Sequence, residues 1–175
     1  MDISNLEKVL EGEPKFRVKQ ANEAVLKNFI ADWQEATFFT QNLRDKLNIE
    51  CPLAINADVL VSHKEDSVKA KITLKDGLQI ETVLMRHNDN RNTVCVSSQV
   101  GCPLGCLFCA TGKMGFKRNL TALEIVEQVI FFSRLLKLED SKVTNVTFMG
   151  MGEPFLNYNN VWEAVKIFND YKYFN

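Results

Sequence analysis

The alternation of strand and helix patterns from residue 93 to residue 171 constrains the fold of this chain more than any other feature. "TVCVSSQV" predicts a strand, "TALEIVEQVIFFSRLLKL" a helix, "KVTNVTF" a second strand and "NNVWEAVKIFNDY" a helix capped by Asn160. Strands and helices that alternate in this way form βα units around a parallel sheet, so the expected fold class is α/β. Two such units leave the faces and one edge of the sheet uncovered. The chain is therefore expected to stop partway through a larger domain.

The residues before this part predict a helical region and a β-hairpin. "VKQANEAVLKNFIADWQE" carries apolar residues at helical spacing from Val18 to about Glu35, and "TQNLRDKLNI" predicts a shorter helix. "VKAKITL" and "QIETVLM" alternate apolar and polar residues on either side of Asp76-Gly77, which indicates a hairpin. The expected organisation is a helical accessory domain over 1–50, a β-hairpin connecting segment over 51–87 and an α/β part over 88–175.

Two local patterns refine the α/β part. Thr121 and Glu124 stand three residues apart at the start of the expected helix, which is the signature of a capping box. In the strand expected from "TVCVSSQV", alternate residues share one face of the sheet. Four residues share the polar face: Thr93, Cys95, Ser97 and Gln99.

Three of the five cysteines lie close together in "GCPLGCLFC", as Cys102, Cys106 and Cys109. Their loop follows the end of an expected strand, where α/β folds place their active sites. An iron–sulfur cluster normally takes four thiolates, so a cluster held by three cysteines keeps one iron open for chemistry. The alternative is a structural zinc ion in an RNA-binding protein. Its fourth ligand would be Cys95, His63 or His87.

A second turn, "MGMGEP" from Met149 to Pro154, also follows an expected strand. Its glycines allow the backbone to approach a ligand closely, and Glu153 offers a carboxylate to a ligand ammonium group. Since the carboxyl ends of parallel strands meet at one edge of a sheet, this turn is expected to face the same pocket as the cysteine loop.

The formal net charge of −1 does not indicate a nucleic-acid-binding protein by itself. From Thr93 to Leu123, however, no acidic residue occurs, and three cations suit RNA phosphates: Lys113, Lys117 and Arg118. The start of the chain does not resemble a signal peptide, and no apolar run is long enough to span a bilayer. We therefore expect a cytoplasmic protein without a membrane partner.

Together these motifs resemble the radical S-adenosylmethionine (radical SAM) adenine-C2 methyltransferases, which modify 23S rRNA and tRNA. The resemblance lies in "ETVLMR", "NTVCVSSQVGCPLGCLFCATGKMGFKRNLT", "EIVEQV" and "GMGEP", with "EPKFRVKQ" and "NLRDKL" near the start. It covers nearly the whole chain from about Glu13. It implies a helical accessory domain and a hairpin segment, followed by the first βα units of a truncated, partial (βα)6 barrel.

The resemblance also implies cofactors and site residues. A [4Fe-4S] cluster is expected on Cys102, Cys106 and Cys109, with the amino and carboxylate groups of SAM on the fourth iron. The remaining assignments are Gly152 and Glu153 as the turn that binds the SAM amino group, Cys95 as the thiol that resolves a covalent protein–RNA intermediate, and Glu81 as the proton acceptor. The loop between Glu81 and Cys95 is one residue longer than the family pattern.

The reaction implied by the resemblance adds a methyl group to C2 of an adenine through a methylcysteine intermediate. Its implied partners are 23S rRNA, tRNA and an electron donor such as flavodoxin or ferredoxin, and the family also suggests a disulfide bond. The methyl-carrying cysteine of the family lies far downstream, whereas this chain has no cysteine after Cys109. The isolated chain is therefore expected to be a truncated, inactive form of such an enzyme.

Overall fold

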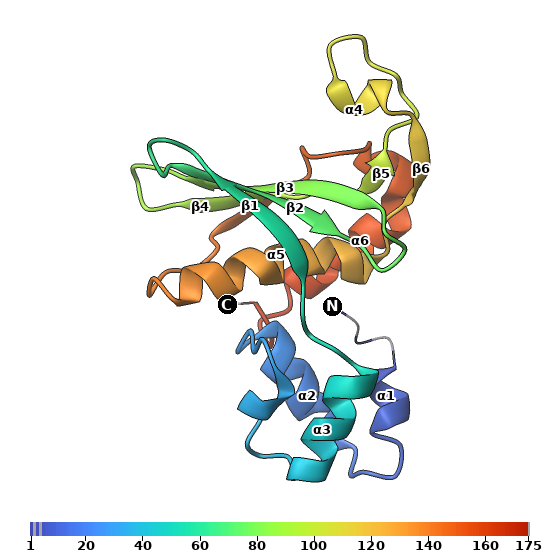
Figure 1. The fold of residues 1–175 in the computed structure, drawn as a ribbon, viewed down its shortest axis with the longest axis vertical. Coiled ribbons are helices and arrows are strands. Elements are labelled where there is room, and N and C mark those ends of the chain that lie inside the picture. Colours follow the sequence, from blue (N-terminus) through green and yellow to red (C-terminus); the bar gives the residue numbers. More distant parts are fainter. Residues whose placement is uncertain (2, 4, 175) are drawn as a thin grey trace. The chain divides into compact units, whose positions relative to one another are not determined.

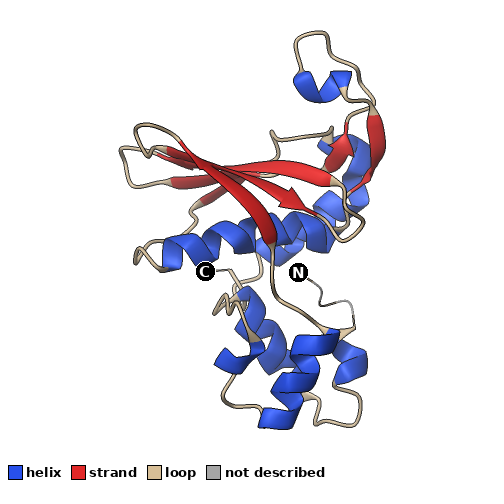
Figure 2. Cartoon of the chain, viewed as in Figure 1, coloured by secondary structure: helices blue, strands red, loops and turns tan. Residues whose placement is uncertain are grey.

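The structure is a computed structural model that describes residues 1, 3 and 5–174. The chain divides into two compact units, Met1–Ile55 with Phe168–Asn175, and Asn56–Ile167. Each unit has its own set of buried apolar side chains. Figure 1 labels helices and strands of both units where there is room, and Figure 2 distinguishes helices from strands.

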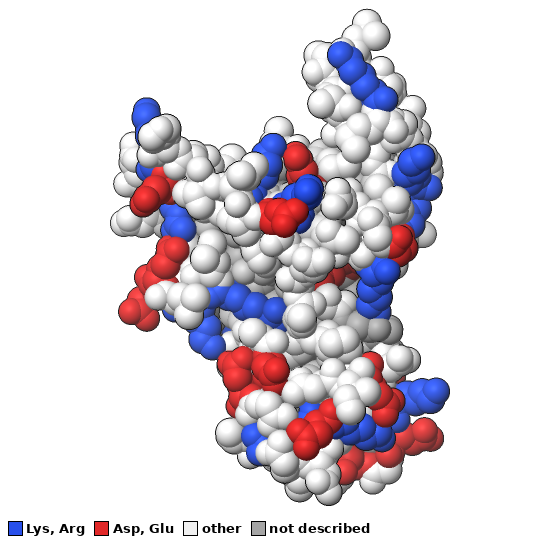
Figure 3. Space-filling view, viewed as in Figure 1, with Lys and Arg blue, Asp and Glu red and all other residues white. Residues whose placement is uncertain are grey.

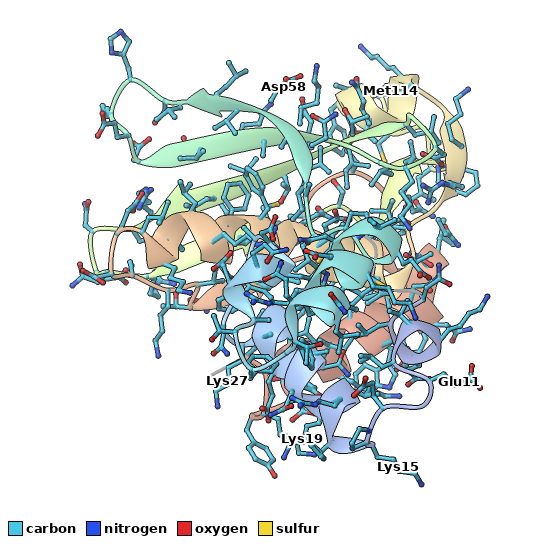
Figure 4. All side chains as sticks on the ribbon, turned by 60° about the horizontal axis from the view of Figure 1, so that its bottom comes forward. Glu11, Lys15, Lys19, Lys27, Asp58 and Met114 are labelled. Atoms are coloured by element: carbon cyan, nitrogen blue, oxygen red, sulfur yellow. The ribbon has the colours of Figure 1, made fainter. Side chains whose placement is uncertain are left out.

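The first unit is helical, with α1 over Leu6–Val9, α2 over Phe16–Leu26, a short 3-10 helix η1 over Trp33–Glu35 and α3 over Gln41–Glu50. The indole of Trp33 is fully buried, and its Nε1 donates a 2.7 Å hydrogen bond to the carbonyl of Cys51. Charged residues on the solvent side project outward, and Figure 4 labels four of them: Glu11, Lys15, Lys19 and Lys27.

The prediction of one helix from Val18 to about Glu35 is wrong. The helix α2 ends at Leu26, and Phe29 adopts a left-handed conformation with φ of 53°. The amide of Ile30 then bonds back to the carbonyl of Ala24 at 3.1 Å, a closure typical of helix C-termini. Apolar spacing continued past this point, but the local backbone bonds end the helix.

The second unit is built on a five-stranded sheet in the order β1-β2-β3-β4-β7. Its first four strands are antiparallel neighbours: β1 over Asn56–Val61, β2 over Ser67–Thr73, β3 over Gln79–Arg86 and β4 over Asn92–Cys95. The strand β7, over Asn145–Thr147, pairs with β4 in parallel. The expected hairpin is confirmed, since β2 and β3 pair around Gly77, which has φ of 79°.

One face of this sheet is covered by α5, over Ala122–Lys137 (Figures 1 and 2). The expected capping box is present: the side chain of Thr121 accepts from the Glu124 amide at 3.2 Å, and Glu124 accepts from the Thr121 amide at 2.8 Å. Fully buried side chains from both elements form the core, among them Ile72, Ile80, Leu84, Ile125, Ile130 and Phe132.

The expected continuous strand over 93–100 is interrupted. The strand β4 ends at Cys95, and β5 begins at Gln99 and runs to Gly101. Between them, the Gln128 side chain of α5 accepts from the Ser97 amide at 2.7 Å and donates to its carbonyl at 2.9 Å. The side-chain amide of Gln128 thus makes the hydrogen bonds to Ser97 that a neighbouring strand would otherwise make. The strand β5 pairs instead with β6, over Phe116–Asn119, in a separate two-stranded sheet.

The final helix begins earlier than expected. A 3-10 turn η2, over Pro154–Asn157, leads directly into α6, over Tyr158–Phe168. Asn160 therefore lies inside the helix rather than at its cap, and its side-chain amide donates to Asn157 at 2.8 Å. In the described part of the chain, no helix combines the length and apolar character needed to cross a membrane.

Candidate functional site

The cysteine loop is a projecting segment whose stem is the β5–β6 pair (Figure 1). At its base, the Cys102 amide donates to the Gly115 carbonyl at 3.2 Å. Gly101 has φ of 75°, and a Cβ at this position would lie 1.8 Å from the Gly115 oxygen. The closure of the loop therefore needs a glycine at residue 101.

Within the loop, Cys102, Cys106 and Cys109 are all partly exposed free thiols. Hydrogen bonds from the backbone N–H groups of Gly112 and Thr111 hold the pKa of Cys109 below its ordinary value, which favours the thiolate that binds metals. A Cβ on Gly112 would lie 2.9 Å from the Cys106 nitrogen, so the loop packs closely on itself.

The loop supplies three thiols, a donor set that a [4Fe-4S] cluster takes and that falls one short of the four ligands of a closed zinc site. Among the residues that the structure describes, no three His, Cys, Asp or Glu side chains are grouped closely enough to hold one ion. A zinc ion needs four ligands that converge on one point at about 2.0–2.3 Å. A four-iron cluster is bulkier and takes thiolates spaced around it, which a partly exposed loop with three thiols can provide.

The turn after β7 lies directly against the strand that leads into the cysteine loop. The Val96 amide donates to the Thr147 carbonyl at 2.8 Å, and the Gly150 amide donates to the Val96 carbonyl at 3.1 Å. The Met151 amide donates to the Ser97 hydroxyl at 2.9 Å. The parallel β4–β7 pairing thus continues into the turn, and it brings the turn and the start of the cysteine loop to the same edge of the sheet.

Two glycines make this close approach possible. A Cβ on Gly150 would lie 2.8 Å from the Ser97 hydroxyl oxygen, and a Cβ on Gly152 would lie 2.5 Å from Cβ of Gln99. Gly152 also has φ of 94°, where L-residues are strained. Glu153 follows, partly exposed, and its carboxylate caps η2 by accepting from the Phe155 amide at 3.1 Å.

Glu81 and Cys95 lie on the sheet face opposite α5. Cys95 is the register partner of Val83, so Glu81 is a diagonal neighbour on the same face, at a Cα separation of roughly 7–8 Å for such pairs. The Glu81 side chain is half exposed and pairs with Lys69 at 3.1 Å. Farther along this face, Asp58, labelled in Figure 4, pairs with Lys71 at 2.9 Å.

The three groups of predicted residues thus occupy neighbouring elements. The carbonyl of Glu81 accepts a 2.5 Å hydrogen bond from the Ser97 hydroxyl, which also accepts from the Met151 amide. The Glu81 amide donates to the sulfur of Met151 at 3.3 Å. The backbone of Glu81 is therefore connected to the glycine turn through one buried serine.

Two expectations are corrected. The suggested disulfide is absent, because all five cysteines are free and Cys95 has Val83 and Thr147 as strand partners rather than a cysteine. Arg118 is not an open phosphate contact, because its guanidinium bonds both oxygens of Glu124 at 2.8–2.9 Å and Asp76 at 2.7 Å.

The two lysines of the loop remain exposed, and Figure 3 shows basic but no acidic side chains on the visible face around α4, over Ala110–Lys113.

Sequence reasoning missed a set of buried polar side chains that connect the site. Apart from Asn119, which is exposed, they are almost fully buried, and they link the strand break, the loop stem and the turn. The set comprises Ser97, Gln99, Asn119, Gln128 and Asn157. The signal was the run "SSQ" within an otherwise apolar strand, because buried polar side chains need specific partners.

Comparisons with known proteins agree with this arrangement. No protein-family profile matches the chain. A protein of Dictyoglomus turgidum named dual-specificity RNA methyltransferase RlmN is 40% identical over 171 residues, 97% of this chain and 49% of that protein. Its namesake from Dictyoglomus thermophilum is 42% identical over 170 residues, 96% of this chain and 49% of that protein.

Among solved structures, a radical SAM methyltransferase from Sphaerobacter thermophilus matches with a TM-score of 0.88 and 38% identity. The match covers 98% of this chain and 51% of that one. The chain therefore spans about half the length of the relatives it matches. The predicted resemblance and the α/β fold class are both confirmed.

Proposed function

We propose that this chain, similar over nearly its whole length to about half of a radical SAM RNA methyltransferase, binds a [4Fe-4S] cluster and SAM. The observation that carries the proposal is the adjacency of two features. A glycine turn beside a carboxylate is joined by backbone hydrogen bonds to residues 96–99, the segment that leads into a loop with three free thiols. Neither feature alone is specific, but a three-thiolate cluster needs a nearby partner for its fourth iron.

In this proposal each group has a separate task. The three loop cysteines hold the cluster, and Gly152 and Glu153 hold the SAM amino group. When bound, the cluster and SAM supply the radical chemistry that acid–base side chains cannot. Glu81 accepts a proton from the substrate, and the Cys95 thiol lies on the same sheet face to attack the covalent adduct.

The proposed reaction of the whole enzyme is methylation of adenine C2 in 23S rRNA and tRNA through a methylcysteine intermediate. The name shared by the similar proteins, dual-specificity RNA methyltransferase, supports methylation of RNA, and the finer parts of the proposal rest on the sequence resemblance. An electron carrier such as flavodoxin or ferredoxin is the proposed reductant. The exposed lysines Lys113 and Lys117 are the proposed phosphate contacts beside the cluster.

The test is anaerobic reconstitution of the chain with ferrous iron and sulfide, followed by metal and sulfide analysis. We expect about four irons and four sulfides per chain, as a [4Fe-4S] cluster requires. A variant with Ala at residues 102, 106 and 109 should hold almost none. Cys51→Ala is the matched control, since Cys51 is buried in the helical unit, and it should keep the full content.

Two results would contradict the proposal. One is equal iron and sulfide in the parent and in the triple variant. The other is zinc without sulfide in the parent, lost on Cys95→Ala, which would support the zinc site instead.

A further inference from the structure

The stem of the cysteine loop holds the Gly152–Glu153 turn through two amide side chains. Gln99 on β5 and Asn119 on β6 are register partners across this stem. Gln99 accepts from the Glu153 amide at 2.9 Å through Oε1 and donates to Asn119 Oδ1 at 2.8 Å through Nε2. Asn119 in turn donates to the Leu156 carbonyl at 3.4 Å. The strands that begin and end the loop therefore both hold the turn.

The burial of Gln99 indicates that its side-chain amide orients the groups it bonds, rather than only filling space in the core. Its side chain is 1% exposed, and the backbone of Gly152 packs against its Cβ and Cγ. An apolar side chain of similar size would fill the same space without the cost of burying an amide. A buried amide stabilises the fold only where its partners are correctly placed, so Gln99 fixes the geometry of the groups it bonds.

The group fixed in this way is the peptide between Gly152 and Glu153. In a planar trans peptide, the N–H and the carbonyl point in opposite directions. Because the Glu153 N–H points at Gln99, the Gly152 carbonyl points away from the loop stem. Among the described residues, no backbone N–H donates to that oxygen. A carbonyl with this direction is a candidate acceptor for a ligand ammonium group.

We propose that Gln99 is a positioning residue that orients the Gly152–Glu153 peptide for the SAM amino group and ties this orientation to the loop that holds the cluster. This inference rests on the proposed function. It assigns a specific role to a residue that lies three positions before the first loop cysteine, Cys102. The loop stem and the amino-group site then move as one body, so the SAM amino group is presented at a fixed place relative to the cluster.

The test compares three variants of the reconstituted chain. Gln99→Met keeps the size of the side chain but neither accepts from Glu153 nor donates to Asn119. Gln99→Glu keeps an acceptor for the Glu153 amide but loses the amide donor to Asn119, so it is a partial rescue. Asn92→Leu is the matched control, because Asn92 is a buried amide at the opposite end of β4 that donates to Ser141 and Lys142.

Two readouts are needed. Anaerobic titration calorimetry measures SAM affinity at equal iron content, and amide hydrogen exchange of the chain before reconstitution measures protection of the turn. We expect Gln99→Met to weaken SAM binding about tenfold or more, equivalent to about 1.4 kcal/mol. It should also accelerate exchange at residues 150–156. Gln99→Glu, which buries a carboxyl in place of an amide, should lie between the parent and Gln99→Met, and Asn92→Leu should destabilise the sheet without changing SAM affinity.

The outcomes separate this inference from the proposed function. If the parent binds SAM and Gln99→Met binds it equally well, the positioning role is wrong and the proposed function stands. A loss of affinity in Asn92→Leu equal to that in Gln99→Met would also overturn it, because general destabilisation would then explain both. If the parent itself holds a cluster but binds no SAM, the proposed function fails and the role of Gln99 fails with it.

Discussion

Replacing Gly101 by Ala should open the base of the cysteine loop. Gly101 has φ of 75°, and the added Cβ would lie 1.8 Å from the Gly115 oxygen and 2.9 Å from its carbonyl carbon. Both contacts are to backbone, so no side-chain rotation relieves them. Either β5 or the residues before β6 must shift, which lengthens the 3.2 Å bond from the Cys102 amide to Gly115.

The magnitude follows from three terms. A non-glycine residue in the left-handed region costs roughly 1–2 kcal/mol. Overpacking against a fixed neighbour adds about 1–3 kcal/mol, and the weakened closing bond adds about 0.5–1.5 kcal/mol. Gly77→Ala is the matched control, because Gly77 has φ of 79° but no atom within 4 Å of the added Cβ. Only the first term applies there, so the two variants should differ by about 1.5–4.5 kcal/mol in local opening free energy.

Native-state hydrogen exchange resolved by mass spectrometry is the appropriate assay, since it reports opening of individual segments. Peptides that cover β5 and β6 should lose protection by a factor of about 30 or more in Gly101→Ala, from a free-energy change of 2 kcal/mol or above. In Gly77→Ala, only the β2–β3 turn should respond. Equal, small effects of the two variants at their own sites would refute the argument that backbone contact, rather than the sign of φ, makes Gly101 necessary.

Two further predictions concern the ion pairs of Arg118 and the activity of the chain. Burial raises the pKa of Glu124, but hydrogen bonds from Arg118 and the Thr121 backbone lower it by more, so that pKa lies below its ordinary value. The hydrogen bond from Arg118 also lowers the pKa of Asp76. The stability that these lowered pKa values contribute is present above the ordinary carboxyl pKa and is lost as pH falls through the folded-state pKa. Between pH 6 and 3, the free energy of unfolding measured in urea titrations should therefore fall more for the parent than for Arg118→Met. Parallel curves for the two proteins would contradict the pairing. In the proposed reaction a further cysteine carries the methyl group, and the 175 residues contain no cysteine after Cys109. The 175-residue chain, reconstituted and supplied with SAM, reductant and unmodified 23S rRNA, should therefore yield no 2-methyladenosine by mass spectrometry. Repeated turnover would contradict the need for that thiol.

The elements with strong local signals were predictable from the sequence. The hairpin around Asp76-Gly77 and the helix that begins at Thr121 depend on turn and cap residues that act within a few positions. The parallel arrangement of β4 and β7 followed from the alternation of strands and helices.

Other features depended on contacts between distant residues and could not be predicted in this way. The strand expected over 93–100 breaks because Gln128, on a helix 31 positions away, bonds both polar backbone groups of Ser97. Arg118 could not be separated from the loop lysines until Asp76, 42 positions earlier, was placed beside it. Local patterns specify elements, whereas buried amides and ion pairs specify where elements meet.

The candidate site shows the same difference between local motifs and long-range contacts. The cysteine spacing and the glycine turn led to the proposed chemistry only when taken together, because neither motif is specific alone. The side chains that hold these motifs together, with Gln99 at their centre, became visible only from their hydrogen bonds.

The central claim, that SAM completes a cluster held by three cysteines beside the Glu153 turn, is tested most directly by electron paramagnetic resonance of the reduced, reconstituted chain. Addition of SAM should shift the spectrum of the parent, because a ligand at the open iron changes the electronic environment of the cluster. Glu153→Ala should require a much higher SAM concentration for the same shift, whereas Glu163→Ala, on the exposed side of α6, should match the parent. A reduced cluster whose spectrum is unchanged by SAM at any concentration would contradict the account.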